Sequence, residues 1–153
     1  MENIQKYPYT YVSADNPFMA AAEKYALENS LDKEMPTGSV IVDSNGLTIG
    51  RGANGSNHHE LFGCERKRQH IPTGEQYELC EGCDPKNHSE LRAIADADND
   101  ELDTFGADLY LWGHFWCCEP CTRAMREAGI ANVYLLEGSD ILFDKTKEGS
   151  IRK

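Results

Sequence analysis

Apolar residues recur along this chain at two spacings, one typical of helices and the other typical of strands. The helical spacing predicts helices over residues 18–29, 91–97 and 121–128. Runs rich in β-branched and apolar residues predict strands at 39–42, 47–49, 107–112 and 132–136. The first two strands flank a turn and should form an antiparallel hairpin, whereas the last two flank a helix and should be parallel neighbours. This order predicts a three-layer α/β/α domain with a mixed sheet.

The residues at the predicted helix starts agree with these boundaries. Asn16 followed by Pro17 is a cap and then a proline, which is typical of a first turn. Asn87 is a good N-cap for the second helix. Pro120 is tolerated only in a first turn, and Gly129 should end the third helix.

Three segments lack a clear pattern. Residues 1–14 are an irregular lead-in by this criterion, and 141–143 could form a short strand. Residues 58–87 are polar and would make an unusually long structureless loop, which indicates a lid or a metal-bound insertion. Because 153 residues without a repeat or linker suit one domain, we expect a single domain over 1–153 with an insertion at 58–87.

Composition narrows the classes of function. The chain carries 26 acidic and 15 basic residues, a net charge of −11, which argues against long nucleic acid as a partner. No apolar run approaches the roughly 18 residues that span a membrane, and the N-terminus lacks the apolar core of a signal peptide. We therefore expect a cytoplasmic protein without a membrane partner, whose six cysteines are reduced and free to bind metal.

Two of the predicted helix starts carry side chains suited to one metal ion. His88, Cys118 and Cys121 are the three ligands that a catalytic zinc typically takes from a protein, with water in the fourth position. Glu90 would lie beside this metal and carry protons. Other interpretations exist for each part, since Asn87 with Glu90 fits a capping box and the two cysteines alone could be a redox pair.

These residues resemble the signature of the zinc-dependent cytidine and deoxycytidylate deaminase superfamily, H-x-E followed about thirty residues later by P-C-x-x-C. Here the two parts read His88-Ser89-Glu90 and Cys117-Cys118-Glu119-Pro120-Cys121. Cys117 stands where that family has proline, and Cys118 gives the two-residue gap to Cys121. The resemblance implies a cytidine deaminase-like fold, a catalytic zinc, hydrolytic deamination and a homo-oligomer. Zinc would lower the pKa of a bound water to about 7.

The resemblance also implies residues that contact the substrate. The segment Gly52-Ala53-Asn54-Gly55-Ser56 is similar to one that follows the second strand of deoxycytidylate deaminases, where the asparagine contacts the sugar, so Asn54 takes that role. Trp116 occupies a position before the signature where relatives often have a small hydroxyl residue, and should shape the pocket. Arg66 and Arg68 belong to the densest basic run and could meet a phosphate.

The insertion contains a second set of possible metal ligands. Cys80 and Cys83 have a zinc-knuckle spacing, and Cys64 can supply a third thiolate. The fourth ligand would be His58, His59 or His70, between which the sequence does not decide. Some deoxycytidylate deaminases carry an extra zinc in the matching insertion, so the resemblance implies a second, structural zinc.

The sequence thus predicts a zinc-dependent nucleotide deaminase, with dCMP converted to dUMP as the favoured reaction. The same chemistry leaves open cytidine, guanine, or adenosine in tRNA as substrates. A zinc-binding interaction module is the alternative outside enzymes, although such a module has no need of Glu90 two residues from a ligand. A thiol redox protein has no need of His88.

Overall fold

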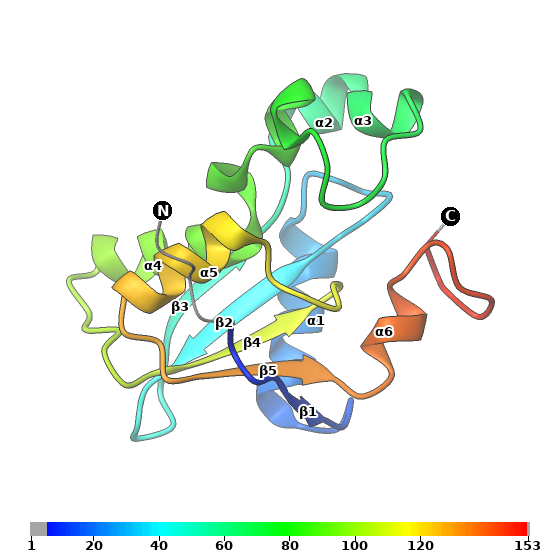
Figure 1. The fold of residues 1–153 in the computed structure, drawn as a ribbon. Coiled ribbons are helices and arrows are strands. Elements are labelled where there is room, and N and C mark those ends of the chain that lie inside the picture. The colour runs from blue at the N-terminus through cyan, green and yellow to red at the C-terminus, as the bar shows by residue number, and fades with distance from the viewer. Residues whose placement is uncertain (1–5, 153) are drawn as a thin grey trace.

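A five-stranded sheet lies at the centre of the computed structural model, which describes residues 6–152 apart from the side chain of His59. The strands follow the order β1-β5-β4-β2-β3 across the sheet (Figure 1). They are β1 (Thr10–Val12), β2 (Gly38–Val42), β3 (Thr48–Ala53), β4 (Asp108–Trp112) and β5 (Asn132–Leu136). β1, β5 and β4 are parallel, whereas β2 is antiparallel to β3 and β4. The predicted mixed sheet is confirmed, with its hairpin and its parallel pair.

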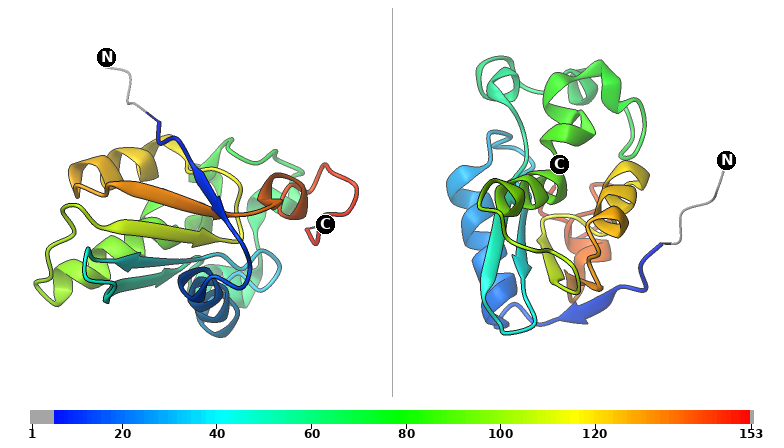
Figure 2. Two further views of the ribbon diagram at one scale, coloured as in Figure 1. Left: turned by 90° about the horizontal axis from the view of Figure 1, so that it is seen from below. Right: turned by 90° about the vertical axis from the view of Figure 1, so that its left-hand side faces the viewer.

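Helices cover both faces of this sheet and complete three layers (Figure 2). The longer ones are α1 (Pro17–Asn29), α4 (Ser89–Asn99) and α5 (Glu119–Glu127), and α6 (Ser139–Leu142) follows β5. Because side chains alternate along a strand, neighbours in β2 belong to different cores. Val40 packs in the core under α1 with Met19, whereas Ile41 packs in the core under α4 and α5 with Met125.

Glycine allows α4 to approach the sheet closely. A Cβ atom at Gly52 would overlap the backbone of Ser89 and Ala93, and one at Gly50 would overlap the carbonyl oxygen of Ala93. The first turn of α4 therefore lies directly on β3. Since that turn contains the predicted proton carrier, the packing of β3 against α4 fixes where the carboxylate lies.

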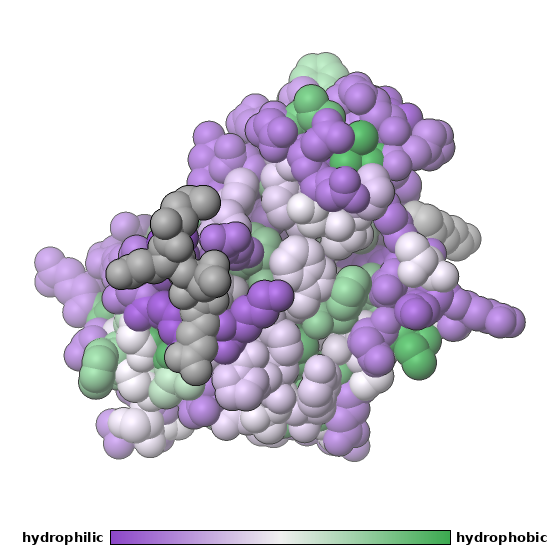
Figure 3. Space-filling view, viewed as in Figure 1, coloured by the Kyte–Doolittle hydropathy of each residue, from purple (hydrophilic) through white to green (hydrophobic). Residues whose placement is uncertain are grey.

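The insertion contains short helices and is not structureless. It comprises α2 (Asn57–Phe62), α3 (Glu65–Arg68), η1 (Tyr77–Leu79), η2 (Glu81–Cys83) and η3 (Pro85–Asn87). These elements stand beyond the end of the sheet, above α4 and α5 in Figure 1. The face of the insertion seen in Figure 3 is mostly hydrophilic. The elements are too short to show a period in the sequence, which is why the pattern suggested only a loop.

Three further expectations are corrected. Residues 10–12 form the edge strand β1 instead of an irregular lead-in, because three residues suffice to pair with β5 but not to show alternation. Residues 141–143 contribute to α6 and its end instead of a strand, since Gly138 adopts a φ of 78° and turns the chain into a helical turn. The N-cap of α4 is His88, and the predicted cap Asn87 is the last residue of η3.

Candidate functional site

His88, Cys118 and Cys121 meet where α4 and α5 begin. His88 and Cys118 are the N-cap residues of the two helices, and Cys121 lies in the first turn of α5. The Nδ1 atom of His88 lies 3.3 Å from Cys121 Sγ and 3.4 Å from Cys118 Sγ, and the two sulfur atoms are 3.0 Å apart. One ion could therefore touch all three side chains, which agrees with the spacing in the sequence. Cys117 is buried but does not belong to this group.

The hydrogen bond on the far side of the His88 ring determines which nitrogen can bind metal. Nε2 lies 2.8 Å from the carbonyl oxygen of Cys83, which can only accept, so Nε2 carries the hydrogen. Nδ1 then presents its lone pair to the two sulfur atoms. A carbonyl partner of this kind is the usual support of a metal-binding histidine.

The electrostatics of the pair of cysteines favour one thiolate. The hydrogen bond with Cys121 lowers the pKa of Cys118, burial opposes this, and His88 lowers it further. In Cys121 the effect is the opposite, because the hydrogen bond with Cys118, together with burial, raises the pKa. A metal ion would replace the shared proton. One imidazole nitrogen and two closely spaced, buried sulfurs at two helix N-termini fit zinc.

Glu90 lies in the same cavity and is held by a chain of hydroxyl groups. Its side chain is buried, and Oε1 accepts a hydrogen bond of 3.0 Å from Ser89 Oγ. Ser89 Oγ lies 2.8 Å from Ser39 Oγ on β2, and because Ser89 donates to Glu90, Ser39 must donate to Ser89. The carboxylate is thus oriented from the sheet. Neither serine was singled out from the sequence, although a serine in the apolar run at 39–42 was a signal.

Cys64, Cys80 and Cys83 form a second group in the insertion. Each offers a sulfur, and the three sulfurs lie within 4.8 Å of one another, with 3.5 Å between those of Cys64 and Cys83. Among the side chains that the structure describes, His58 and His70 do not join this group. The side chain of His59, the third predicted candidate, lies outside that description. The thiols that the spacing predicted to come together do so.

Arg66 contacts this second group through its guanidinium. Its guanidinium donates to the carbonyl oxygens of Glu75 and Pro72 and lies 3.3 Å from Cys83 Sγ. It also stacks over the ring of Tyr77 at 4.5 Å. Arg66 is buried and lines the cavity, but its donors are committed to the insertion. Arg68 pairs with Glu65 on the surface and does not line the cavity.

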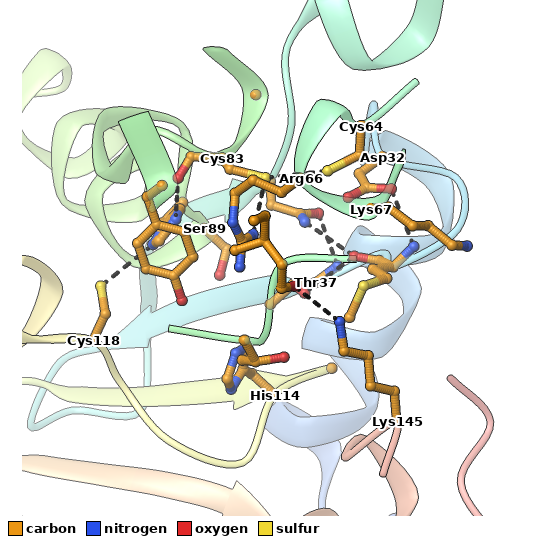
Figure 4. A pocket seen from close by; sticks show the side chains of 18 of the residues that line it. Asp32, Thr37, Cys64, Arg66, Lys67, Cys83, Ser89, His114, Cys118 and Lys145 are labelled. Atoms are coloured by element: carbon orange, nitrogen blue, oxygen red, sulfur yellow. Dashed lines mark hydrogen bonds between the residues drawn. The ribbon is translucent and has the colours of Figure 1, made fainter. Parts of the chain in front are cut away.

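One cavity joins both groups of possible ligands (Figure 4). It is lined by His88, Glu90 and Cys118 at one end and by Cys64 and Cys83 at the other. The remaining walls come from the loop before β2, the end of β3, the insertion, the loop after β4 and the C-terminal segment, which we define as residues 138–152.

Asn54 and Trp116 both line this cavity, as predicted for substrate-contacting residues. The Asn54 amide also holds the neighbouring loop, because Oδ1 accepts from the Thr37 N–H and from Ser30 Oγ while Nδ2 donates to the Met35 carbonyl. One N–H of that amide has no bond among these contacts. The Trp116 ring lies at the insertion, beside Gly74.

The sequence did not single out two other polar groups of the cavity. Lys145 reaches from the C-terminal segment toward the insertion, where Nζ donates to the carbonyl oxygen of Ile71 at 3.3 Å (Figure 4). His114 follows β4, and its Nδ1 accepts from the backbone N–H groups of Phe115 and Trp116, so Nε2 carries the hydrogen. Burial, with the charges of His88 and Arg152, lowers the pKa of His114 to about 3. Neither residue belongs to a motif, so no signal in the sequence could have found them.

The layered mixed sheet and the histidine-cysteine group define an α/β protein with a candidate metal centre. The profile of a family described as the cytidine and deoxycytidylate deaminase zinc-binding region matches residues 12–137. This match covers most of the chain, so the protein belongs to that family and is a deaminase of the cytidine deaminase-like superfamily. No curated protein matches the chain.

Several solved structures are similar to this chain at low identity. The apo dCMP deaminase of the cyanophage S-TIM5 is 22% identical, with a TM-score of 0.51 over 80% of this chain and 84% of that one. The same enzyme in complex with dCMP and dUMP is 22% identical, with a TM-score of 0.50 over 80% and 82%. The guanine deaminase of Bacillus subtilis is 20% identical, with a TM-score of 0.49 over 86% and 72%. The first two similarities show a common fold.

Proposed function

We propose that this protein is a zinc-dependent hydrolytic deaminase that converts dCMP to dUMP. The observation that carries the proposal is one cavity lined by His88 and Cys118 of the candidate metal centre, by the Glu90 carboxylate and by Lys145. A zinc-binding interaction module would not need a buried carboxylate there. A redox protein would not need the imidazole.

The roles of the residues follow from their positions. His88, Cys118 and Cys121 would hold the zinc, which supplies an activated water at neutral pH. Glu90 would accept one proton of that water and deliver it to the ring nitrogen of the base, and would then carry the second proton of the same oxygen to the amine, which leaves as ammonia. Ser89 keeps Glu90 Oε1 in place during both transfers. Asn54 binds the sugar through its remaining N–H group, and Trp116 closes the pocket around the base.

The charges around the cavity support a substrate that carries a phosphate. Lys67, Lys145 and Arg66 line the cavity, although the whole chain has a net charge of −11. Lys67 pairs with Glu34 at 2.9 Å and Arg66 is committed to carbonyl groups. No carboxylate pairs with Lys145 among the residues that the structure describes, so we assign the phosphate contact to Lys145. The phosphate contact that the sequence suggested for Arg66 and Arg68 is therefore assigned to Lys145 instead.

The remaining parts of the proposal concern the assembly and the second metal. Cys64, Cys80 and Cys83 would bind a structural zinc, which makes 58–87 a metal-bound insertion in one domain of 153 residues. The reducing conditions of the cytoplasm would keep the six cysteines as thiols able to bind metal, so we propose that the protein works there. No helix within residues 6–152 is long and apolar enough to cross a membrane. We also propose that the chain forms a homo-oligomer.

Ammonia release from a panel of substrates tests this function. We expect zinc-loaded protein to act on dCMP with a higher kcat/KM than on deoxycytidine, cytidine, guanine or an adenosine-containing tRNA stem-loop. Preference for any of the others would replace dCMP as the substrate. No release from the whole panel, with zinc bound, would favour the interaction module.

A pair of lysine variants separates phosphate recognition from general effects. Lys145→Met should raise KM for dCMP and leave kcat/KM for deoxycytidine unchanged, because only the nucleotide carries the group that Lys145 binds. Lys147→Met removes an exposed lysine two positions away that does not line the cavity, and should change neither value. An equal loss on both substrates in Lys145→Met would remove the phosphate role.

A further inference from the structure

Cys83 connects the two groups of possible metal ligands through two different atoms. Its sulfur lies in the group with Cys64 and Cys80, and its carbonyl oxygen accepts the hydrogen bond from His88 Nε2 at 2.8 Å. We propose that metal binding at the thiol group of the insertion positions His88 through this carbonyl, so that the two metal sites fill cooperatively. The inference rests on the metal binding in the function proposed above and is independent of the substrate.

A second contact connects His88 to the same part of the insertion. The ring of Tyr77 meets the His88 ring edge-on, with 4.9 Å between the ring centroids. Tyr77 is itself stacked under Arg66, whose NH1 group lies 3.3 Å from Cys83 Sγ. The imidazole is thus contacted at Nε2 and on its ring by groups that surround the thiols. A change in the thiol group therefore reaches His88 by two routes.

The segment that carries the Cys83 carbonyl is short and buries few large side chains. η2 contains only three residues, and the buried residues of η1, η2 and η3 are Gly82, Cys83 and Asn87. Three thiols joined by one ion would fix this segment, because metal binding to such a site contributes directly to folding. The ion would therefore fix the orientation of the carbonyl more firmly than the short helix does.

Loss of the carbonyl would weaken the first metal site in a defined way. A neutral imidazole carries one hydrogen, and the bond to Cys83 keeps it on Nε2. When that bond is absent, the hydrogen can move to Nδ1, the atom that faces Cys118 and Cys121. Removing an outer partner of a metal-binding histidine typically costs about 10–100-fold in metal affinity. Because coupling between two binding sites is reciprocal, filling either site should strengthen the other by the same factor.

Zinc titration against a competing chelator tests the coupling in a variant that leaves the first site intact. Cys64→Ser removes one thiol of the insertion, and Cys64 is not among the hydrogen-bond partners of His88. We expect the affinity of the His88, Cys118 and Cys121 site for zinc to fall about 10–100-fold. Cys64→His, which keeps a metal ligand at that position, should restore it. Leu61→Ala, an exposed change in the same insertion, is the matched control and should have no effect.

The wild-type protein supplies a second measurement that does not depend on how a variant folds. Metal-free protein is titrated with Co²⁺, whose absorption distinguishes a three-thiolate site from a site with two thiolates and one imidazole. Coupled sites should fill together, so both bands should rise along one curve. Two independent binding curves, or a zinc affinity in Cys64→Ser within twofold of the wild type, would overturn the proposal. Either result would leave deaminase activity to be judged on its own assay.

Discussion

At the scale of single residues, the Glu90 side chain is buried and yet lines the cavity. Glu90→Gln preserves the size of the side chain but cannot carry a proton. We expect kcat to fall by about 10²–10⁴-fold while zinc content and melting temperature stay unchanged. Ammonia release gives kcat, metal analysis gives the zinc content, and thermal unfolding gives the melting temperature. Glu119→Gln, an exposed change at the start of α5, serves as the control, and near-normal turnover in Glu90→Gln would contradict the mechanism.

His114 should make the stability of the protein depend on pH in the acid range. The pKa of an unfolded histidine is near 6.5, whereas in the fold it is lowered to about 3. Between these values the unfolded chain binds more protons, so the free energy of unfolding falls as the pH falls. The contribution is absent above pH 6.5 and reaches at most about 1.4 kcal/mol per pH unit below it.

His114→Gln provides the comparison for this pH dependence. Glutamine can still accept the backbone hydrogen bonds through its carbonyl oxygen, but it does not titrate. Urea unfolding at several pH values between 7 and 4 should show the wild type losing stability faster than the variant. Parallel curves for the two proteins would show that His114 does not titrate in this way.

The residues that the sequence identified are those whose roles need a particular side chain at a particular spacing. His88, Cys118 and Cys121 come together because each lies at a helix start, and a local pattern predicts such starts. Ser39, His114 and Lys145 reach the site only through the packing of distant segments. Ser39 has a local signal, since it is a polar residue in an apolar run, but nothing local distinguishes His114 or Lys145 from other residues of their kind.

At the scale of elements, close packing between α4 and β3 determines where Glu90 lies. Gly52→Ala would place a methyl group against the backbone of Ser89 and Ala93, which cannot move without shifting the first turn of α4. The overlap should lower the free energy of unfolding by about 1–3 kcal/mol. The stiffer unfolded chain should raise it by only about 0.4–1 kcal/mol, so we expect the variant to be less stable. Denaturant unfolding measures the difference.

Activity gives the second half of the same test. Because the shifted turn carries Ser89 and Glu90, kcat should fall in Gly52→Ala as well. Arg51→Ala changes the neighbouring, exposed position of β3 and should affect kcat much less. Full activity in Gly52→Ala would mean that the helix tolerates the methyl group and that β3 does not position the carboxylate.

Element prediction succeeded where a segment was long or carried its own boundary signals. The hairpin of β2 and β3 and the pair of β4 and β5 follow from apolar runs and the turn or helix between them. β1 and α6 escaped because the former is three residues long and the latter four. Pairing with β5 holds β1 in the sheet. The end of α6 is held by the Phe143 ring, whose centroid lies 5.0 Å from that of Trp112. Both partners are distant in the chain.

At the scale of the whole molecule, two parts are stabilised by different interactions. The sheet and its helices bury the large apolar side chains, of which Met19, Ile41, Leu109, Leu111, Met125, Leu135, Val40 and Val133 are almost fully enclosed. In the insertion, Leu61 and Phe62 are exposed, and the buried side chains among those described from 58 to 87 are Arg66, Cys80, Cys83 and Asn87. Apolar burial can therefore hold the sheet without metal, but it cannot hold the insertion.

Removal of metal should consequently loosen one part of the molecule before the other. Hydrogen exchange of zinc-loaded and chelator-treated protein, read by mass spectrometry, can follow both parts at once. We expect peptides from residues 58–87 to exchange faster after chelation, while peptides that contain Leu109 to Leu111 and Val133 to Leu135 keep their protection. Cys80→Ser should reproduce the fast exchange of the insertion with zinc present, whereas Leu79→Ala, an exposed neighbour, should not. Equal protection of residues 58–87 with and without metal would show that the insertion is held by its own packing, and the thiols would then have no structural part in the fold.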